Sequence, residues 1–179
     1  CVGKLEPMPE TPKDQFTLFG DNYEEKLNTW NFRRLLAQRY DVVVTNPPYM
    51  NSKGMSPTLS SFVKKNFPRS NSDLYAVFME RSYDLCKAYG YLGFMTSYTW
   101  LFLSSYAEMR EYLAKNKGIV TLIQPEYHAF FEEAYVPICT FVISNHQADF
   151  KGKYIRLGDF YGAEIQETKT LEAIHNNNC

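Results

Sequence analysis

The stretch that decides the fold is Asp41-Val42-Val43-Val44-Thr45, followed directly by Asn46-Pro47-Pro48-Tyr49. The run of β-branched residues, bounded by Asp41 and by two prolines, predicts a short strand that is buried on both faces, as in a parallel sheet. Asn46 then lies at the carboxyl end of this strand, where open α/β sheets place their ligands. A functional site is therefore expected directly after the strand.

The quartet Asn46 to Tyr49 combines two hydrogen-bond acceptors, a stiff backbone and an aromatic ring. The Asn46 side-chain oxygen and the Pro47 carbonyl can accept the two N–H bonds of an amide or aromatic amine, whose nitrogen lone pair is otherwise delocalised. The prolines fix φ and add no competing donor. Tyr49 offers a face on which a base could stack. The pattern favours methyl transfer to such a nitrogen; the alternative is a strand end with a rim aromatic.

Two stretches carry a resemblance to a known family: Asn46-Pro-Pro-Tyr-Met-Asn-Ser-Lys-Gly-Met-Ser-Pro57 and Ser72-Asp-Leu-Tyr-Ala-Val-Phe-Met-Glu80. The chain resembles the amino-type, adenine-N6 S-adenosylmethionine-dependent DNA methyltransferases, and within them the PglX-type enzymes of bacterial BREX phage-defence systems. The resemblance covers most of residues 35–175 and departs from the family pattern at Asn51, where the pattern has Gly. It implies S-adenosylmethionine as methyl donor, double-stranded DNA as partner, a flipped adenine as substrate, and Asn46, Pro47, Pro48 and Tyr49 as the catalytic residues.

The same resemblance implies a second stacking residue, Phe131. In related enzymes an aromatic residue just before the last hairpin strand stacks on the other face of the flipped base, with a Val five positions later. Phe131 and Val136 fit that spacing. Burial is the alternative, because Phe130 lies beside Phe131 and aromatic residues mostly supply core area.

Four further residues are candidates for the site. Thr99 and Trp100 follow a predicted strand at its carboxyl end, so they either border the cofactor or base pocket or pack in the core. Lys64 and Lys65 either contact DNA phosphates or form a solvated helix face. Residues 50–71 read as a polar loop with one helical turn near 59–66, which is either a lid or a segment ordered only in the whole enzyme.

Helices and strands alternate along the chain. Helices are expected at 23–39, 72–90, 105–117 and 163–176, and strands at 41–45, 91–98, 119–124, 138–144 and 154–157. Ser72 is expected to cap the second helix and Gly90 to end it, and Ser105 with Glu108 to form a capping box for the third. The short interval makes strand 138–144 an antiparallel partner of 119–124. The predicted fold class is α/β: with the resemblance, the carboxyl-terminal half of a Rossmann-like methyltransferase domain, with a mostly parallel sheet, one antiparallel hairpin strand and helices on its faces.

Features of a cofactor-binding half are missing from the sequence. It has no Gly-x-Gly pair and no apolar run in its first forty residues, and it begins at Cys1. We therefore expect an excised piece, with a lead-in and helix at 1–40 and a partial methyltransferase catalytic domain at 41–179. The cofactor-binding half and the target-recognition domain would lie outside it. S-adenosylmethionine is not expected to bind this piece well.

Composition sets broad limits on function. The chain of 179 residues is 45% hydrophobic and 16% aromatic, which predicts a folded domain, and its net charge of −1 gives no basic footprint, so double-stranded DNA is expected to bind through the full-length protein. Four cysteines without metal spacing indicate reduced thiols in a cytoplasmic protein, and no metal site is expected. No run suits a membrane span. Other subunits of a phage-defence complex are further candidate partners.

Two other functions remain open. Protein-glutamine N5-methyltransferases share Asn-Pro-Pro-Tyr, because an amide nitrogen poses the same electronic problem as an aromatic amine. The continuation Met50-Asn-Ser-Lys-Gly-Met55 disfavours that group. The other alternative is a non-catalytic scaffold piece of a defence complex. Analysis of the methylated product, N6-methyladenine or modified glutamine, distinguishes adenine methylation from the first alternative. An Asn46→Ala variant distinguishes adenine methylation from the second.

Overall fold

The computed structural model describes residues 5–10, 23–128, 137–147 and 150–176. Its contacts divide the chain into two compact units, residues 1–39 and 40–179. In the first unit, helix α1 (Tyr23–Ala37) is contacted by the segment that contains Glu6. The Trp30 indole donates a hydrogen bond of 2.8 Å to the Glu6 carbonyl, and the Arg33 guanidinium lies 3.5 Å from the Glu6 carboxylate.

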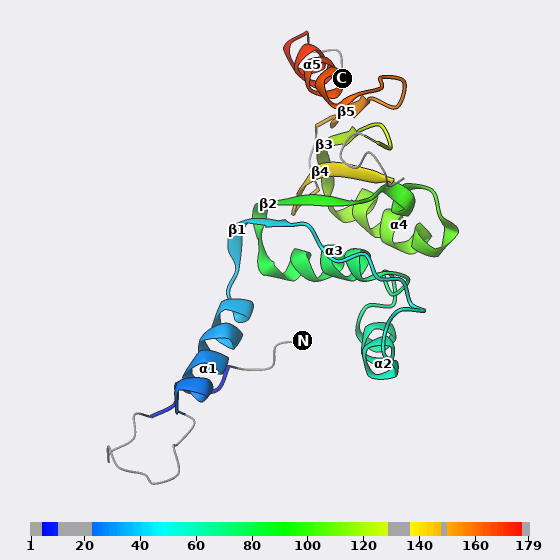
Figure 1. The fold of residues 1–179 in the computed structure, drawn as a ribbon. Coiled ribbons are helices and arrows are strands. Elements are labelled where there is room, and N and C mark those ends of the chain that lie inside the picture. The colour runs from blue at the N-terminus through cyan, green and yellow to red at the C-terminus, as the bar shows by residue number, and fades with distance from the viewer. Residues whose placement is uncertain (1–4, 11–22, 129–136, 148–149, 177–179) are drawn as a thin grey trace. The chain divides into compact units, whose positions relative to one another are not determined.

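The second unit is built on a five-stranded mixed sheet in the order β1-β2-β4-β3-β5 (Figure 1). Its strands are β1 (Tyr40–Thr45), β2 (Cys86–Ser97), β3 (Gly118–Gln124), β4 (Ile138–Ser144) and β5 (Lys153–Arg156). The pairs β1–β2 and β3–β5 are parallel, and β4 runs antiparallel to both β2 and β3. Four strands therefore share one direction and β4 opposes them. The predicted α/β class, with a mostly parallel sheet and one antiparallel strand, is confirmed.

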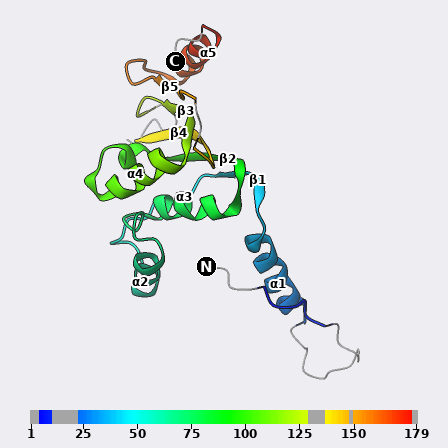
Figure 2. The same ribbon diagram turned by 180° about the vertical axis from the view of Figure 1, so that it is seen from behind.

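One face of the sheet is covered by helices α3 (Leu74–Leu85) and α4 (Ala107–Asn116), as both views show (Figures 1 and 2). The main hydrophobic core lies between these helices and the strands. Its buried members include Tyr75, Met79, Leu92, Phe94, Trp100, Met109, Leu113, Phe141 and Ile143. The alternation along β2 and β4 turns every second side chain toward this core.

The opposite face of the sheet is apolar at β1 but exposed. Val42 is 58% exposed and Val44 is 74% exposed, whereas Val43, between them, packs against the core. The prediction that this strand is buried on both faces is therefore wrong for the described residues. The physical reason is that the described helices α3 and α4 cover only the face toward which Val43 points.

The two ends of α3 differ from the prediction. Its N-cap is Asp73, not Ser72, and its last residue is Leu85, so Gly90 does not end it. Instead the Asn145 amide donates to the carbonyls of Tyr83, Cys86 and Lys87 at 3.0 to 3.1 Å, which satisfies acceptors at the helix end. Gly90 lies within β2, where a Cβ would stand 2.4 Å from the Asp41 carbonyl oxygen. Glycine there permits the close approach of β1 and β2.

Three other elements refine the predictions. Helix α4 follows two short 3-10 turns, η1 (Tyr98–Leu101) and η2 (Ser104–Tyr106), and its N-cap Tyr106 makes no side-chain cap bond, so the predicted capping box is wrong. The predicted loop 50–71 contains a full helix, α2 (Pro57–Asn66), capped by Ser56. Helix α5 (Ala163–His175) agrees with prediction to within one residue.

Candidate functional site

The Asn46 side chain is exposed directly after β1, whereas Pro47 is buried. Thr45 and Asn46 line a groove of about 640 Å³, together with the residues of β1 to β4 that alternate with the core residues on the open side of the sheet: Val44, Gly93, Met95, Thr121, Ile123, Thr140 and Val142. Phe94 and Phe141, whose side chains belong to the covered core, border the same groove. An Asn46 amide sealed away from any cavity would have contradicted the predicted chemistry. The buried proline holds the backbone while the amide beside it remains accessible.

Several strands end at the same edge of the sheet as β1. Because β1, β2, β3 and β5 run parallel, their carboxyl ends meet there, as ligand-binding edges of α/β sheets do. The Tyr98 backbone N–H donates to the Pro137 carbonyl at 2.9 Å, and the hydroxyls of Tyr98 and Tyr127 are in contact. The segments that follow β2 and β3 are thus tied together next to the start of β4.

Tyr49 is held from one side by the core. Its ring meets that of Tyr75 edge to face, with centroids 5.9 Å apart and planes at 77°. Tyr49 is 43% exposed, so part of its ring is free for a stacking partner. Burial raises the pKa of both phenols, and the hydrogen bond between the Tyr75 hydroxyl and Thr99 Oγ1, at 3.1 Å, only partly offsets this for Tyr75. Both rings are therefore neutral at neutral pH.

The segment that follows Tyr49 is fixed to the start of α3. Asp73 Oδ1 accepts hydrogen bonds from the N–H groups of Met50 and Tyr75, at 2.9 and 3.2 Å. Asn51 Oδ1 accepts from the backbone N–H groups of Lys53 and Gly54, at 3.1 and 3.3 Å, which closes a turn. At the position where the family pattern has Gly, Asn51 therefore stabilises the loop through its side chain.

Helix α2 is anchored by a small hydrophobic cluster of its own, made of Met55, Val63, Phe67 and Val77, with Leu59 and Leu74 packed against it. The segment 50–71 is thus folded onto α3. Lys64 and Lys65, in the last turn of α2, are both exposed. Among the described residues, neither has an ion-pair partner, so both are available to an external anion.

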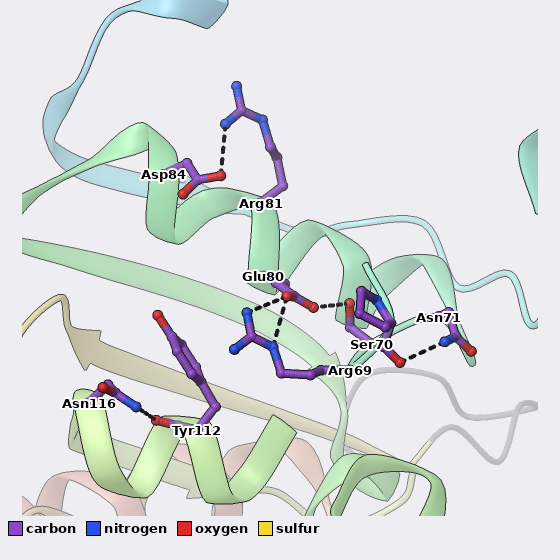
Figure 3. A network of polar contacts seen from close by, with 9 residues as sticks. Arg69, Ser70, Asn71, Glu80, Arg81, Asp84, Tyr112 and Asn116 are labelled. Carbon is purple, nitrogen blue, oxygen red and sulfur yellow. Dashed lines mark hydrogen bonds and ion pairs between the residues drawn. The ribbon is translucent and has the colours of Figure 1, made fainter. Parts of the chain in front are cut away.

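Arg69 ties the segment after α2 to both covering helices (Figure 3). Its guanidinium donates to Glu80 Oε1 at 3.0 and 2.6 Å, and the Ser70 hydroxyl donates to Glu80 Oε2 at 2.6 Å. The same guanidinium lies 4.0 Å from the centroid of the Tyr112 ring on α4. One side chain therefore links α3, α4 and the end of the segment 50–71.

A buried carboxylate stabilises the turn after β3. Glu126 is 3% exposed and accepts hydrogen bonds from the His128 backbone at 2.8 Å and from the His128 ring at 3.0 Å. Burial by itself raises the pKa of this carboxyl, but the hydrogen bonds from the backbone and the ring of His128 outweigh burial and lower the pKa below its ordinary value. Glu126 is therefore ionised at neutral pH and fixes this turn at the edge of the sheet.

The remaining predicted site residues are Thr99, Trp100 and Phe131, and each has a different outcome. Thr99 is half-buried and joins the network at the end of β2, where its Oγ1 lies 2.9 Å from Ser97 Oγ. Trp100 is 1% exposed and packs against Phe141, the position that the packing alternative describes. Phe131 lies outside the described residues. Sequence reasoning missed Asp73 and Tyr75, although both stand in the quoted stretch Ser72 to Glu80.

The groove beside Asn46 can be compared with what S-adenosylmethionine needs. The groove beside Asn46 has hydroxyl and amide groups but no acidic residue for a ribose and no glycine-rich turn, so these residues do not form a complete S-adenosylmethionine site. In the part of the chain that the structure describes, no cluster of three His, Cys, Asp or Glu side chains could hold a metal ion. Nor does any helix within that part have the length and apolar character needed to cross a membrane.

Solved structures with this fold are S-adenosylmethionine-dependent methyltransferases and restriction-modification enzymes. A class I S-adenosylmethionine-dependent methyltransferase from Listeria monocytogenes matches 87% of this chain and 53% of its own, with a TM-score of 0.57 and 18% identity. The type ISP restriction-modification enzyme LlaGI, solved with a DNA substrate mimic, matches 87% of this chain and 15% of its own, with a TM-score of 0.62 and 13% identity. The fold is therefore that of an S-adenosylmethionine-dependent methyltransferase.

Sequence comparison identifies the family. The model of the Eco57I restriction-modification methylase family matches residues 7–131, and the chain belongs to this family. The adenine-specific methyltransferase BrxX of Escherichia coli O9:H4 (strain HS) is 38% identical over 148 residues, which cover 81% of this chain. The adenine-specific methyltransferase PglX of Lacticaseibacillus casei (strain Zhang) is 37% identical over 158 residues, 83% of this chain. The resemblance to PglX-type enzymes is confirmed.

The chain corresponds to a small part of these relatives. It spans 12% of the length of BrxX and 13% of the length of PglX. The part that is matched includes the stretch from Asn46 to Tyr49.

Proposed function

We propose that the chain forms part of the catalytic domain of a longer DNA adenine-N6 methyltransferase. In this proposal, residues 41–179 belong to the domain and residues 1–40 lead into it. The whole protein methylates a flipped adenine in double-stranded host DNA, for restriction-modification or phage defence in the cytoplasm, alongside other subunits of a defence complex. S-adenosylmethionine, when bound, supplies an electrophilic methyl group.

The observation that carries the proposal is the exposed Asn46 amide beside the buried Pro47 at the carboxyl end of β1. In this role the Asn46 side-chain oxygen and the Pro47 carbonyl accept the two N–H bonds of the adenine amine. Both oxygens stabilise the positive charge that develops on this nitrogen as it bonds to carbon. The stiff proline backbone keeps the two acceptors in place without reorganisation.

The other residues have supporting roles in this proposal. Tyr49 stacks on one face of the extruded base with the part of its ring that Tyr75 leaves free, a contact of about 1–3 kcal/mol. Phe131 stacks on the other face. The exposed amines of Lys64 and Lys65 contact DNA phosphates, which position a duplex without reading its sequence.

The test uses the full-length protein with the variant Asn46→Ala and, as a matched control, Asn116→Ala on an exposed helix end. N6-methyladenine is quantified by mass spectrometry of nucleosides from the treated DNA. We expect Asn46→Ala to lower kcat by about 10²–10³-fold, because one preorganised acceptor is lost, while Asn116→Ala keeps wild-type activity. Full activity of Asn46→Ala would remove this residue from the mechanism.

The same measurement separates the alternatives. Methylated glutamine in a protein substrate, with unmodified DNA, would replace the proposal with protein-glutamine N5 methylation. Absence of methyl transfer to either substrate by the wild-type protein would leave the scaffold alternative. In that case the exposed Asn46 amide would have no catalytic role.

A further inference from the structure

We propose that Asp73 is the positioning residue of the catalytic loop, an inference that rests on the proposed function. The Asp73 carboxylate bridges two segments through a single oxygen atom. Oδ1 accepts a hydrogen bond from the Met50 N–H at 2.9 Å and from the Tyr75 N–H at 3.2 Å. Met50 directly follows Tyr49, and Tyr75 lies in the first turn of α3. The bridge therefore joins the loop that carries Asn46 to a helix of the core.

The loop needs such an anchor because of its own composition. Pro47 and Pro48 lack N–H groups, so these two residues cannot donate the backbone hydrogen bonds that usually fix a loop. Met50, immediately after the motif, uses both its N–H and its carbonyl to make hydrogen bonds to the start of α3. Its N–H donates to Asp73, and its carbonyl accepts from the Leu74 N–H at 3.0 Å.

The backbone on both sides of the Asp73 bridge is paired, and we call this pairing of residues 50–52 with 72–74 the clamp. Asn51 and Asp73 form an antiparallel bridge, and the Ser52 N–H donates to the Ser72 carbonyl at 3.0 Å. These backbone bonds set the register of residues 50–52 against 72–74. The Asp73 carboxylate adds a bond at the end of the clamp nearest to Tyr49, where a displacement would move the catalytic residues most directly.

Asp73 also positions the aromatic side of the site. By accepting the Tyr75 N–H it fixes the start of α3, from which the Tyr75 ring meets Tyr49 edge to face at 5.9 Å. The Tyr75 hydroxyl then lies 3.1 Å from Thr99 Oγ1, after β2. Asp73 is thus linked to the backbone after Tyr49 through Met50, and to the Tyr49 ring through Tyr75.

A purely structural role for Asp73 is the competing explanation, because it is the N-cap of α3. Capping needs only an oxygen that accepts the Tyr75 N–H, and Ser, Asn and Asp cap helices about equally well. The bond to Met50 is additional to capping. Ser at this position has a side chain shorter by one bond, so it can cap α3 without reaching Met50. Asn keeps an oxygen at the position of Oδ1 and can make both bonds.

The experiment compares Asp73→Ser and Asp73→Asn in the full-length protein, with Asp84→Ser at the other end of α3 as the matched control. The measurements are kcat and KM for adenine methylation, the melting temperature, and the fluorescence of 2-aminopurine at the target base. We expect Asp73→Ser to lower kcat by about 10- to 100-fold, as small displacements of catalytic groups do, with KM and melting temperature little changed. Asp73→Asn should remain within about threefold of wild type, because it restores the same acceptor.

A second readout does not depend on activity. The Met50 amide should lose protection from hydrogen exchange in Asp73→Ser and keep it in Asp73→Asn and Asp84→Ser. Unchanged kcat and unchanged Met50 protection in Asp73→Ser would overturn the inference and leave Asp73 as a helix cap. Failure of Asp73→Asn to restore kcat and protection would overturn it too. An inactive wild-type protein would instead contradict the proposed function, and the exchange measurement would still test the bridge.

Discussion

The two faces of the sheet have similar strand chemistry and opposite surroundings. On the covered face, Leu92, Phe94 and Phe141 are at most 4% exposed beneath α3 and α4. On the other face, Val44 is 74% exposed, although it stands in the apolar run Val42-Val43-Val44. The contrast teaches that an apolar strand face predicts the capacity to be buried, while the cover itself depends on segments elsewhere in the molecule.

The segment from Asn46 to Tyr49 lies at the boundary between these two faces. Asn46 lines the groove on the open face, whereas Tyr49 rests against Tyr75, a member of the covered core. The described core therefore fixes the aromatic side of the site, and the amide side faces the open groove. Perturbing each face in turn should produce different effects.

The largest effect is expected from opening the covered core on β4. Phe141→Ala should lower the free energy of unfolding by about 3–5 kcal/mol, because Phe141 is 2% exposed and its removal leaves a cavity. Its neighbour Val142 turns to the groove side, so Val142→Ala should cost about 1 kcal/mol or less. Urea denaturation of the chain measures both values. Equal losses from the two substitutions would mean that both faces are covered alike in solution.

A smaller effect is expected from releasing the polar link between α3 and α4. Glu80→Ala should lower the free energy of unfolding by about 1–2 kcal/mol, because it leaves Arg69 and the buried Ser70 hydroxyl without their acceptor. The control is Glu111→Ala, which breaks an exposed pair with Lys115 within α4 and should leave unfolding unchanged. Urea denaturation distinguishes them. A Glu80 variant as stable as wild type would show that hydrophobic packing alone holds the two helices on the sheet.

Much of the fold could be predicted because it is specified locally. The run 41–45, the pairing of 119–124 with 138–144, and the last helix all follow from short-range periodicity and punctuation. The end of α3 could not be predicted in this way. The sequence predicts that a glycine stops the helix at position 90, but the helix ends at Leu85, where Asn145, sixty residues further on, donates hydrogen bonds to the carbonyls of Tyr83 and Cys86. Gly90 instead lies where β1 approaches β2 too closely to leave room for a side chain.

In the candidate site, too, some features follow from the local sequence and others depend on residues far away in the chain. The position of Asn46 at a carboxyl strand end is a local property, since it follows from the strand before it and from the prolines after it. The role of Asp73 is not local, because its partner Met50 lies 23 residues earlier. Ser72 and Asp73 are both good capping residues, and only the pairing of 50–52 with 72–74 decides between them. A sequence pattern carries no information about that pairing.

The smallest expected effect is also the sharpest test of the two faces, because it uses adjacent residues of β1. Val43→Thr places a hydroxyl against the core and should cost about 1 kcal/mol in unfolding free energy. Val44→Thr places the same hydroxyl on the exposed face and should change stability by less than about 0.5 kcal/mol. The two variants make the same substitution at adjacent positions of one strand. A difference between their free energies of unfolding, measured by urea denaturation, therefore reflects only the face of the sheet on which the residue lies. If Val44→Thr cost as much as Val43→Thr, the open face would be covered in solution, and Asn46 beside it would lie in an enclosed pocket rather than an open groove.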